Sequence, residues 1–321
     1  MSKVGKDSPL RESPENCPRR SACAVCGILL LACLSGPLVA QELQPRAYIP
    51  APVGLNFVTF GYSRNAGGLL YDGAMPLEDG NAKAGAVSVG FGQSLGFLGR
   101  SVQILAVLSY MEADLSAVYA GAGTYRYRSG LNDAIFRFSM NIHGAPAMSR
   151  SEFGTYHQKS IVGASVTVSA PTGQYDPNVA INLGTNRWGV KPEIGVSRAI
   201  GKWTLEGAAG VWLYTSNHQF YGQSVRAQTA MGSSQAHIVR FLPRRTWVAF
   251  DATYFNGGRA SVDGVDRPNY LGNSRLGATF GFALKPRHAI KISYFAGALT
   301  RYGSEAQSIG ITYTIIWQKG H

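Results

Sequence analysis

Cysteine is missing from most of this sequence, because Cys17, Cys23, Cys26 and Cys33 all lie within its first 33 residues. A chain that loses this stretch has no disulfide and no thiolate ligand. It therefore cannot be a disulfide-stapled scaffold or a cysteine-based zinc module. A cysteine-free chain also suits export, since it forms no wrong disulfides in an oxidising compartment.

Charged residues and long apolar runs are scarce as well. Only 15% of the 321 residues are charged, against about 25% in an average domain. No run of about 18 apolar residues follows residue 40, so we expect no membrane-spanning helix there. The 45% hydrophobic and 11% aromatic content excludes a disordered chain, and the 39 glycines argue against a helical bundle.

The excess of basic residues is spread thinly along the chain. The net charge is +12, and removing residues 1–40 leaves 25 Lys and Arg against 15 Asp and Glu, a net +10. In that remainder only Arg244 and Arg245 are adjacent basic residues. Nucleic-acid binding needs a concentrated basic patch, so we predict no nucleic-acid partner.

Motifs for catalysis are not evident. The six histidines are scattered, and no His-Glu-x-x-His metal motif occurs. The glycines between Gly90 and Gly96 do not have the spacing that binds a dinucleotide. We predict that the chain is no enzyme and holds no cofactor and no metal.

The N-terminus has the layout of an export signal. Arg19 and Arg20 precede an apolar stretch over residues 22–34, and Ala40 supplies a small residue for cleavage. We predict a secretory signal peptide over residues 1–40. An alternative is lipidation at Cys33, because residues 30–33 resemble a lipoprotein cleavage box.

Beyond this signal, apolar and polar residues alternate with a period of two. In the last segment Ile309, Ile311 and Tyr313 share one face, whereas Ser308 and Gly310 share the other. A soluble sandwich and a transmembrane barrel both produce such two-faced strands. Membrane strands need about 9–11 residues, whereas ordinary strands have about 5–6. The length of the alternating segments therefore predicts an all-β fold, a transmembrane antiparallel up-and-down β-barrel.

The alternation predicts about twelve strands, an even number as in bacterial barrels. Residues 225–241 fit either a strand or part of a long loop. Links at 199–201 and 285–287 read as periplasmic turns, and 216–245 and 257–273 as extracellular loops. We expect an N-terminal periplasmic segment over residues 41–53 and the barrel over 54–321. The predicted strands are 54–63, 84–93, 101–111, 115–127, 131–143, 158–170, 187–198, 203–215, 246–256, 274–284, 288–297 and 306–317.

The final strand carries an assembly-like pattern. Ser308, Gly310, Tyr313 and Ile315 match the order polar-x-Gly-x-x-aromatic-x-hydrophobic. This order resembles the signal that the outer-membrane assembly machinery reads. We therefore expect that machinery and outer-membrane lipid as partners, and a bacterial outer-membrane location.

Several blocks resemble one family of outer-membrane barrels. They are residues 169–176 (SAPTGQYD), 182–188 (NLGTNRW) and 191–195 (KPEIG), together with 129–133, 257–259 and the C-terminal text from Arg275 to Trp317. These blocks resemble the family named for the MetA-pathway of phenol degradation. The resemblance implies an outer-membrane location and transport of aromatic or other small organic compounds.

Two groups of residues are candidates for a solute path. The block over residues 170–191 fits either a structural connection or a loop folded towards the lumen. The charges on polar faces, Lys202 and Glu206 among them, either line a pore or form a salt-bridged plug, and rings of basic side chains favour anions. The predicted solute-path residues are Arg137, Tyr175, Asp176, Arg187, Lys191, Glu193, Asp251, Arg275, Lys291 and Phe295.

Two functions remain open at this point. The first is passive uptake of small hydrophobic or aromatic solutes through a lumen of modest width, as expected for about twelve strands. The alternative is a non-transporting barrel with a structural or adhesive role. The sequence identifies no solute.

Overall fold

The structure is a computed structural model that describes residues 45–70, 77–119, 122–178, 182–301, 303–304 and 307–318. The predicted signal peptide over residues 1–40, its cleavage after Ala40 and the alternative lipidation at Cys33 lie outside the described residues. Within the described residues, no helix has the length and apolar content needed to cross a membrane.

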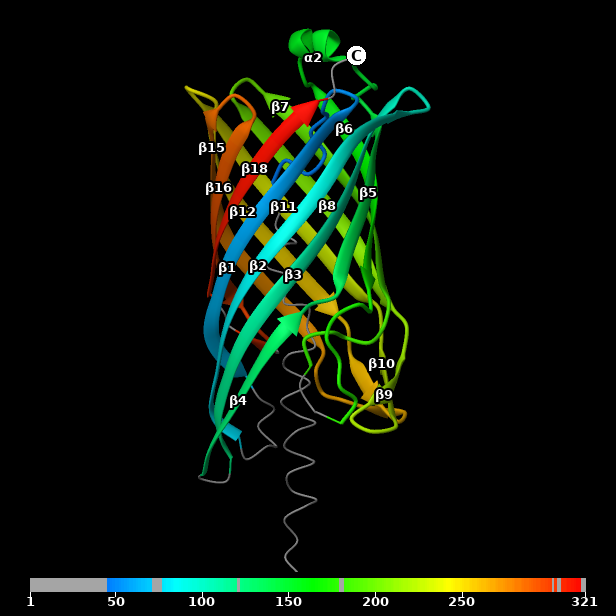
Figure 1. The fold of residues 1–321 in the computed structure, drawn as a ribbon, viewed down its shortest axis with the longest axis vertical. Coiled ribbons are helices and arrows are strands. Elements are labelled where there is room, and N and C mark those ends of the chain that lie inside the picture. The colour runs from blue at the N-terminus through cyan, green and yellow to red at the C-terminus, as the bar shows by residue number, and fades with distance from the viewer. Residues whose placement is uncertain are drawn as a thin grey trace, which may run out of the picture.

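The described strands form a closed antiparallel barrel with twelve positions in its wall (Figure 1). Each strand pairs with its neighbours along the wall, and β1 closes the barrel by pairing with both β2 and β18. β4 and β5 together occupy one position, since both pair with β3. The strands of the wall are β1 (Leu55–Leu70), β2 (Leu77–Phe97), β3 (Arg100–Tyr119), β4 (Ala122–Leu131), β5 (Ala134–His143), β6 (Ser160–Ala170), β7 (Gly189–Ile200), β8 (Trp203–Tyr214), β11 (Met231–Leu242), β12 (Thr246–Gly257), β15 (Leu271–Lys285), β16 (His288–Leu299) and β18 (Gln307–Gln318).

The remaining elements lie between these strands. A small sheet joins β9 (Asn217–Phe220), β10 (Ser224–Gln228), β13 (Ala260–Val262) and β14 (Val265–Asp266). β17 (Gly303–Ser304) pairs with β1, and the short helix α2 (Arg150–Thr155) connects β5 to β6.

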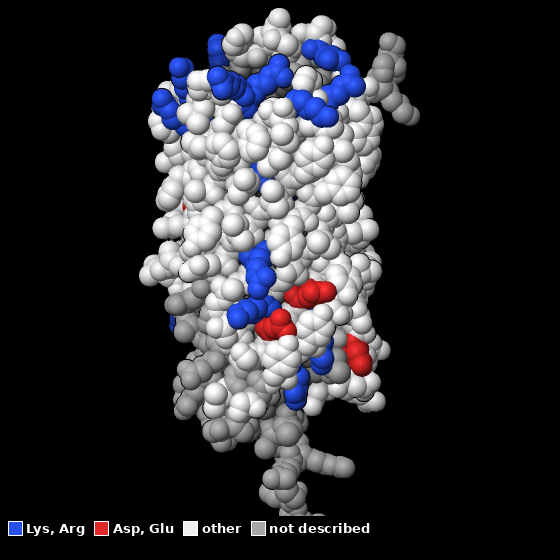
Figure 2. All heavy atoms as spheres, turned by 60° about the vertical axis from the view of Figure 1, so that its left-hand side comes forward, with Lys and Arg blue, Asp and Glu red and all other residues white. Residues whose placement is uncertain are grey.

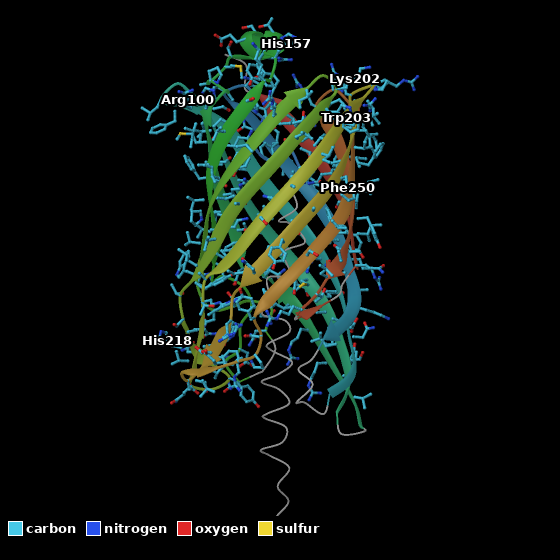
Figure 3. The ribbon with its side chains drawn as sticks, turned by 180° about the vertical axis from the view of Figure 1, so that it is seen from behind. Arg100, His157, Lys202, Trp203, His218 and Phe250 are labelled. Atoms are coloured by element: carbon cyan, nitrogen blue, oxygen red, sulfur yellow. The ribbon has the colours of Figure 1, made fainter. Side chains whose placement is uncertain are left out.

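The two faces of each strand meet different surroundings, as the alternation predicts. In β18, Ile309 and Ile311 are about half exposed on the outer wall, while Ser308 is buried. Phe250 projects from the outside of β12 (Figure 3). Because apolar side chains cover the outside and polar ones fill the inside, the wall is suited to lipid. The predicted all-β transmembrane barrel is confirmed.

One predicted division between strands is wrong, and one region left open by the sequence is a strand. The predicted strands 101–111 and 115–127 are one long strand, β3, followed by the start of β4. Glu112 and Asp114 interrupt the apolar face there without ending the strand. Within the region 216–245, residues 225–241 fit either a strand or a loop by sequence, and the structure places the wall strand β11 there. The first half of its outer face carries Gly232, Ser234 and Ala236, so it alternates only weakly.

The connections differ in length between the two ends of the barrel. One end holds short turns after β2, β7, β11 and β15, together with α2, and we call it the short-turn end. The other end holds the described residues 171–178 and 182–188 and the small sheet, and we call it the long-loop end. Lys202 and His157 mark the first, and His218 marks the second (Figure 3).

Basic side chains gather at the short-turn end (Figure 2). Among the described residues there, the one exposed carboxylate is that of Glu152. This end of the barrel is therefore electropositive. The exposed basic residues are Arg100, Arg150, Lys159, Arg198, Lys202, Arg244, Arg245, Lys285 and Arg287.

Candidate functional site

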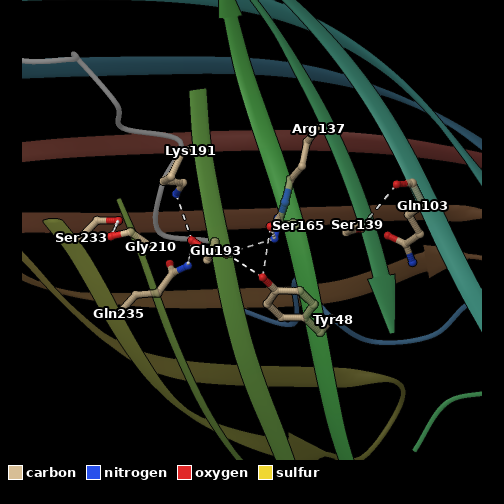
Figure 4. A network of polar contacts seen from close by, with 10 residues as sticks. All are labelled: Tyr48, Gln103, Arg137, Ser139, Ser165, Lys191, Glu193, Gly210, Ser233 and Gln235. Atoms are coloured by element: carbon tan, nitrogen blue, oxygen red, sulfur yellow. Dashed lines mark hydrogen bonds and ion pairs between the residues drawn. The ribbon is translucent and has the colours of Figure 1, made fainter. Parts of the chain in front are cut away.

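The lumen contains a network of polar side chains centred on Glu193 of β7 (Figure 4). Glu193 Oε2 accepts from Lys191 Nζ at 3.0 Å and from Gln235 Nε2 at 3.2 Å. Its Oε1 lies 3.3 Å from Arg137 Nη2. The Glu193 side chain is only 4% exposed. A buried carboxylate needs such partners, because an unpaired charge loses its hydration without compensation.

The segment over residues 45–53 supplies a further member of this network. Tyr48 donates its hydroxyl proton to Glu193 Oε1 at 2.8 Å, and its oxygen lies 3.1 Å from Ser165 Oγ. Its ring covers Gly163 and Gly195, where an added Cβ would stand 2.2 Å from ring carbons. These two glycines therefore make the room that the Tyr48 ring occupies. The sequence predicts residues 41–53 as a periplasmic segment, and in the described part of it Tyr48 reaches residues that line the lumen.

A second polar group surrounds Asp251 of β12. Asp251 Oδ1 lies 2.6 Å from His237 Nδ1, and Oδ2 accepts from Thr279 Oγ1 at 2.6 Å. Lys291 of β16 feels the charge of Asp251 at longer range. In the part of the chain that the structure describes, no cluster of three or more His, Cys, Asp or Glu side chains could hold a metal ion.

The connection over residues 171–188 is held at the long-loop end by Asp133. Asp133 Oδ1 accepts from the Gly173 backbone N–H at 2.9 Å, and Oδ2 accepts from the Thr185 N–H at 2.9 Å and hydroxyl at 2.6 Å. A Cβ on Gly173 would stand 2.7 Å from the Gly184 Cα. Glycine is therefore required at both positions, which explains two of the motif residues structurally.

The three predicted path residues of this connection lie apart from the Glu193 network. Tyr175 donates its hydroxyl proton to the Gln219 carbonyl at 2.8 Å. Asp176 is exposed and accepts from the Asn178 N–H at 2.8 Å. Arg187 is 4% exposed, and its guanidinium carbon Cζ lies 4.4 Å from the centroid of the Tyr214 ring.

The other predicted path residues fall on the inner wall. Phe295 is 3% exposed and packs over Gly277 on the neighbouring strand. Arg275 lies two residues before Gly277 on β15, so the two residues share the inward face of the strand. Lys202, expected on an inner face, instead lies exposed in the turn between β7 and β8, because the strand ends at Ile200.

The lumen also holds a cavity of about 500 Å³, which meets the Glu193 network at Arg137. Its wall comes from β1, β2, β3, β5, β12, β15, β16 and β18 and from the segment over residues 45–53. Phe57 and Trp247 supply aromatic surface, whereas Thr312 and Thr314 supply hydroxyls. The network and the cavity therefore divide the lumen into a filled side and an open side.

Sequence reasoning missed several lumen residues. Tyr48 and Arg46 precede the first strand, where no periodicity indicates which way a side chain points. Gln235 and His237 lie on β11, the strand whose alternation is weak. Their two-residue spacing, which puts both on one face of a strand, is the one usable signal.

Comparison with solved structures shows what the fold is similar to. The COG4313 outer membrane channel from Pseudomonas putida F1 superposes with a TM-score of 0.70 at 17% identity, covering 86% of this chain and 100% of that chain. The transport unit of the autotransporter AIDA-I from Escherichia coli gives a TM-score of 0.50 at 8% identity, covering 95% of this chain and 100% of that one. No curated protein matches the sequence.

A family model matches residues 72–314, under the description "Putative MetA-pathway of phenol degradation". The match includes β3, the connection over residues 171–188 and both polar groups of the lumen apart from Tyr48. It spans well over half of the chain. This chain therefore belongs to the MetA-pathway family of outer-membrane β-barrels.

Proposed function

We propose that this protein is an outer-membrane channel for the passive diffusion of small hydrophobic or aromatic compounds. The observation that carries the proposal is the open side of the lumen, a cavity of about 500 Å³ with Phe57 and Trp247 in its wall. Cavities of roughly 300–1,000 Å³ hold small organic molecules. The fold similarity to a protein described as an outer membrane channel supports the same proposal.

The alternative is a barrel that transports nothing and serves a structural or adhesive role. The filled side of the lumen favours it, because Tyr48, Arg137, Lys191 and Glu193 obstruct that half with paired charges. The connection over residues 171–188 and the small sheet would then present a surface outside the cell.

Liposome swelling separates the two proposals. Purified barrel is reconstituted into liposomes, which are transferred into isotonic solutions of a small sugar or of benzyl alcohol with an impermeant osmolyte. We expect swelling with benzyl alcohol that scales with the amount of barrel, while protein-free liposomes supply the baseline. Permeability equal to that baseline for every solute would support the structural role instead.

We further propose that the protein is exported by the signal over residues 1–40 and inserted through its C-terminal strand, with residues 41–53 as a separate N-terminal segment. The test is the mass of the protein purified from outer membranes. A chain beginning at Gln41 supports cleavage after Ala40, whereas an acylated Cys33 would contradict it.

A further inference from the structure

The open side of the lumen has an unbalanced charge. Four basic side chains line the cavity, Arg46, Arg137, Arg245 and Lys291, and none of its described lining residues is Asp or Glu. A cavity lined by cations in a low-dielectric wall attracts anions, because little solvent screens the charge there.

Two of these cations already have partners. Arg137 is bonded to Glu193 on the filled side. The Arg46 guanidinium lies 5.2 Å from the ring centroids of both Phe241 and Trp247, and the negative charge of Glu206 acts on it. Their charge is thus partly compensated, so neither is the main anchor for a ligand.

Lys291 differs from them. Among the described residues, no carboxylate lies within ion-pair distance of its Nζ. Asp251 is the carboxylate whose charge reaches it, but both Asp251 oxygens are bonded, to His237 and to Thr279. Arg245, exposed in the turn before β12, is the second cation without a described carboxylate partner.

The strand register leaves space beside Lys291. Its directly opposed neighbours are Gly281 on β15 and Thr312 on β18, and Gly61 on β1 lies opposite Thr312. Directly opposed residues point to the same face of a sheet. A glycine and a small hydroxyl therefore flank the lysine instead of bulky side chains.

The same row of residues places Trp247 two strands away from Lys291. Trp247 on β12 is opposed to Gly281, and a Cβ on Gly281 would stand 2.3 Å from the Trp247 ring. The indole therefore covers the glycine that separates it from Lys291. Ring, ammonium and free space lie together within one cavity.

We propose that this cavity binds an aromatic carboxylate, with its ring against Trp247 and its carboxylate on Lys291, assisted by Arg245. The ammonium supplies a charge-assisted hydrogen bond, and the indole supplies apolar contact area. This assignment rests on the proposed channel function and narrows its solutes to those that combine a ring with a negative charge.

The direct test is calorimetric titration of the full-length barrel in detergent with four probes. Benzoate has both the ring and the charge, benzyl alcohol has the ring alone, acetate has the charge alone, and benzylamine has a ring with the opposite charge. We expect benzoate to bind about tenfold more tightly than benzyl alcohol or acetate, because it alone makes both contacts. Benzylamine should show the weakest binding of the three ring compounds.

Variants then assign the contacts. Lys291→Met should weaken benzoate binding about tenfold and leave benzyl alcohol binding unchanged. Trp247→Leu should weaken both ring compounds. Lys83→Met is the matched control, because Lys83 is exposed on the outer wall opposite Asp114 and the substitution removes the same charge without touching the cavity.

Equal binding of benzoate, benzyl alcohol and acetate would overturn the proposal, and so would unchanged benzoate binding in Lys291→Met. The wild-type probe series decides the matter even if a variant fails to fold. Benzoate binding by a barrel that makes no liposome permeable would uphold the site and overturn the channel function. Permeable liposomes without selective benzoate binding would uphold the channel function and overturn the proposed binding site.

Discussion

At the scale of single residues, Glu193 is the member of the lumen network on which the others depend. Its two oxygens lie within hydrogen-bond reach of Tyr48, Arg137, Lys191 and Gln235. Two cations, Arg137 and Lys191, share this one carboxylate, so its loss removes the counter-charge of both. Removing one member of a buried ion pair lowers the free energy of unfolding by more than the intact pair contributes to it, because the remaining charge is uncompensated.

We expect Glu193→Gln to lower the free energy of unfolding by about 3 kcal/mol for that reason. Reversible urea unfolding in liposomes, followed by tryptophan fluorescence, provides the measurement. Asp266→Asn is the control, since its pair with Arg259 is largely exposed, and we expect a change below about 1 kcal/mol there. Equal effects of the two substitutions would contradict the role assigned to Glu193.

Gly195 allows Tyr48 to lie against the inner wall. We expect Gly195→Ala to displace the Tyr48 ring, because the added Cβ would stand 2.2 Å from it. Hydrogen exchange over residues 45–53 should then accelerate. Gly207→Ala is the control, as the nearest atom to its added Cβ is 3.8 Å away. Unchanged exchange in Gly195→Ala would show that the glycine does not determine this contact.

At the scale of elements, the connection over residues 171–188 is anchored at a break in the wall. The position shared by β4 and β5 is interrupted at Asn132 and Asp133, and the Asp133 carboxylate takes up three donors from the connection. Hydrogen bonds to a charged acceptor are stronger than those to a neutral one. The break therefore fixes the connection instead of weakening the wall.

Asp133→Asn should loosen this connection by about 2 kcal/mol, because the amide supplies fewer and weaker acceptors. Exchange of the Gly173 and Thr185 amides, measured by mass spectrometry, should accelerate, while amides in the middle of β7 keep their wild-type rates. Acceleration throughout the barrel would instead indicate global destabilisation.

The short helix α2 has a pH-dependent cap. Ser149 and Glu152 form a capping box, and hydrogen bonds from Ser149 lower the pKa of Glu152 below its usual 4.5. Because the pKa of Glu152 is lower in the folded than in the unfolded state, its ionised carboxylate stabilises the helix at pH values above the unfolded-state pKa. This stabilisation is lost as the pH falls through the folded-state pKa. We expect the helical chemical shifts of residues 150–155 to become smaller in that acidic range. In Glu152→Gln they should not vary with pH.

At the scale of the whole molecule, the charge distribution predicts the ion selectivity of the pore. The chain after residue 40 has a net charge of +10. The short-turn end is electropositive, and the cavity is lined by cations without a carboxylate among its described residues. We expect an anion preference in planar bilayers, seen as a reversal potential displaced towards that of chloride in a KCl gradient. A displacement towards potassium would contradict this prediction.

The sequence by itself determined the barrel, its apolar outer wall and the inward direction of most of the charges. It could do so because a strand alternates with a period of two and lipid accepts only apolar side chains on one face. Arg137, Glu193, Asp251 and Lys291 follow from this rule. Alternation assigns a side chain to a face but not to a partner.

Only the tertiary structure decided which inward residues meet. The pairing of Glu193 with Arg137, and of Asp251 with His237, depends on strand register and on barrel closure, which join residues far apart in the chain. Tyr48 reaches the lumen through a segment without periodicity, and β11 pairs with β8 and β12 despite a weakly apolar outer face. The lumen is thus divided into filled and open sides by contacts that no local pattern encodes.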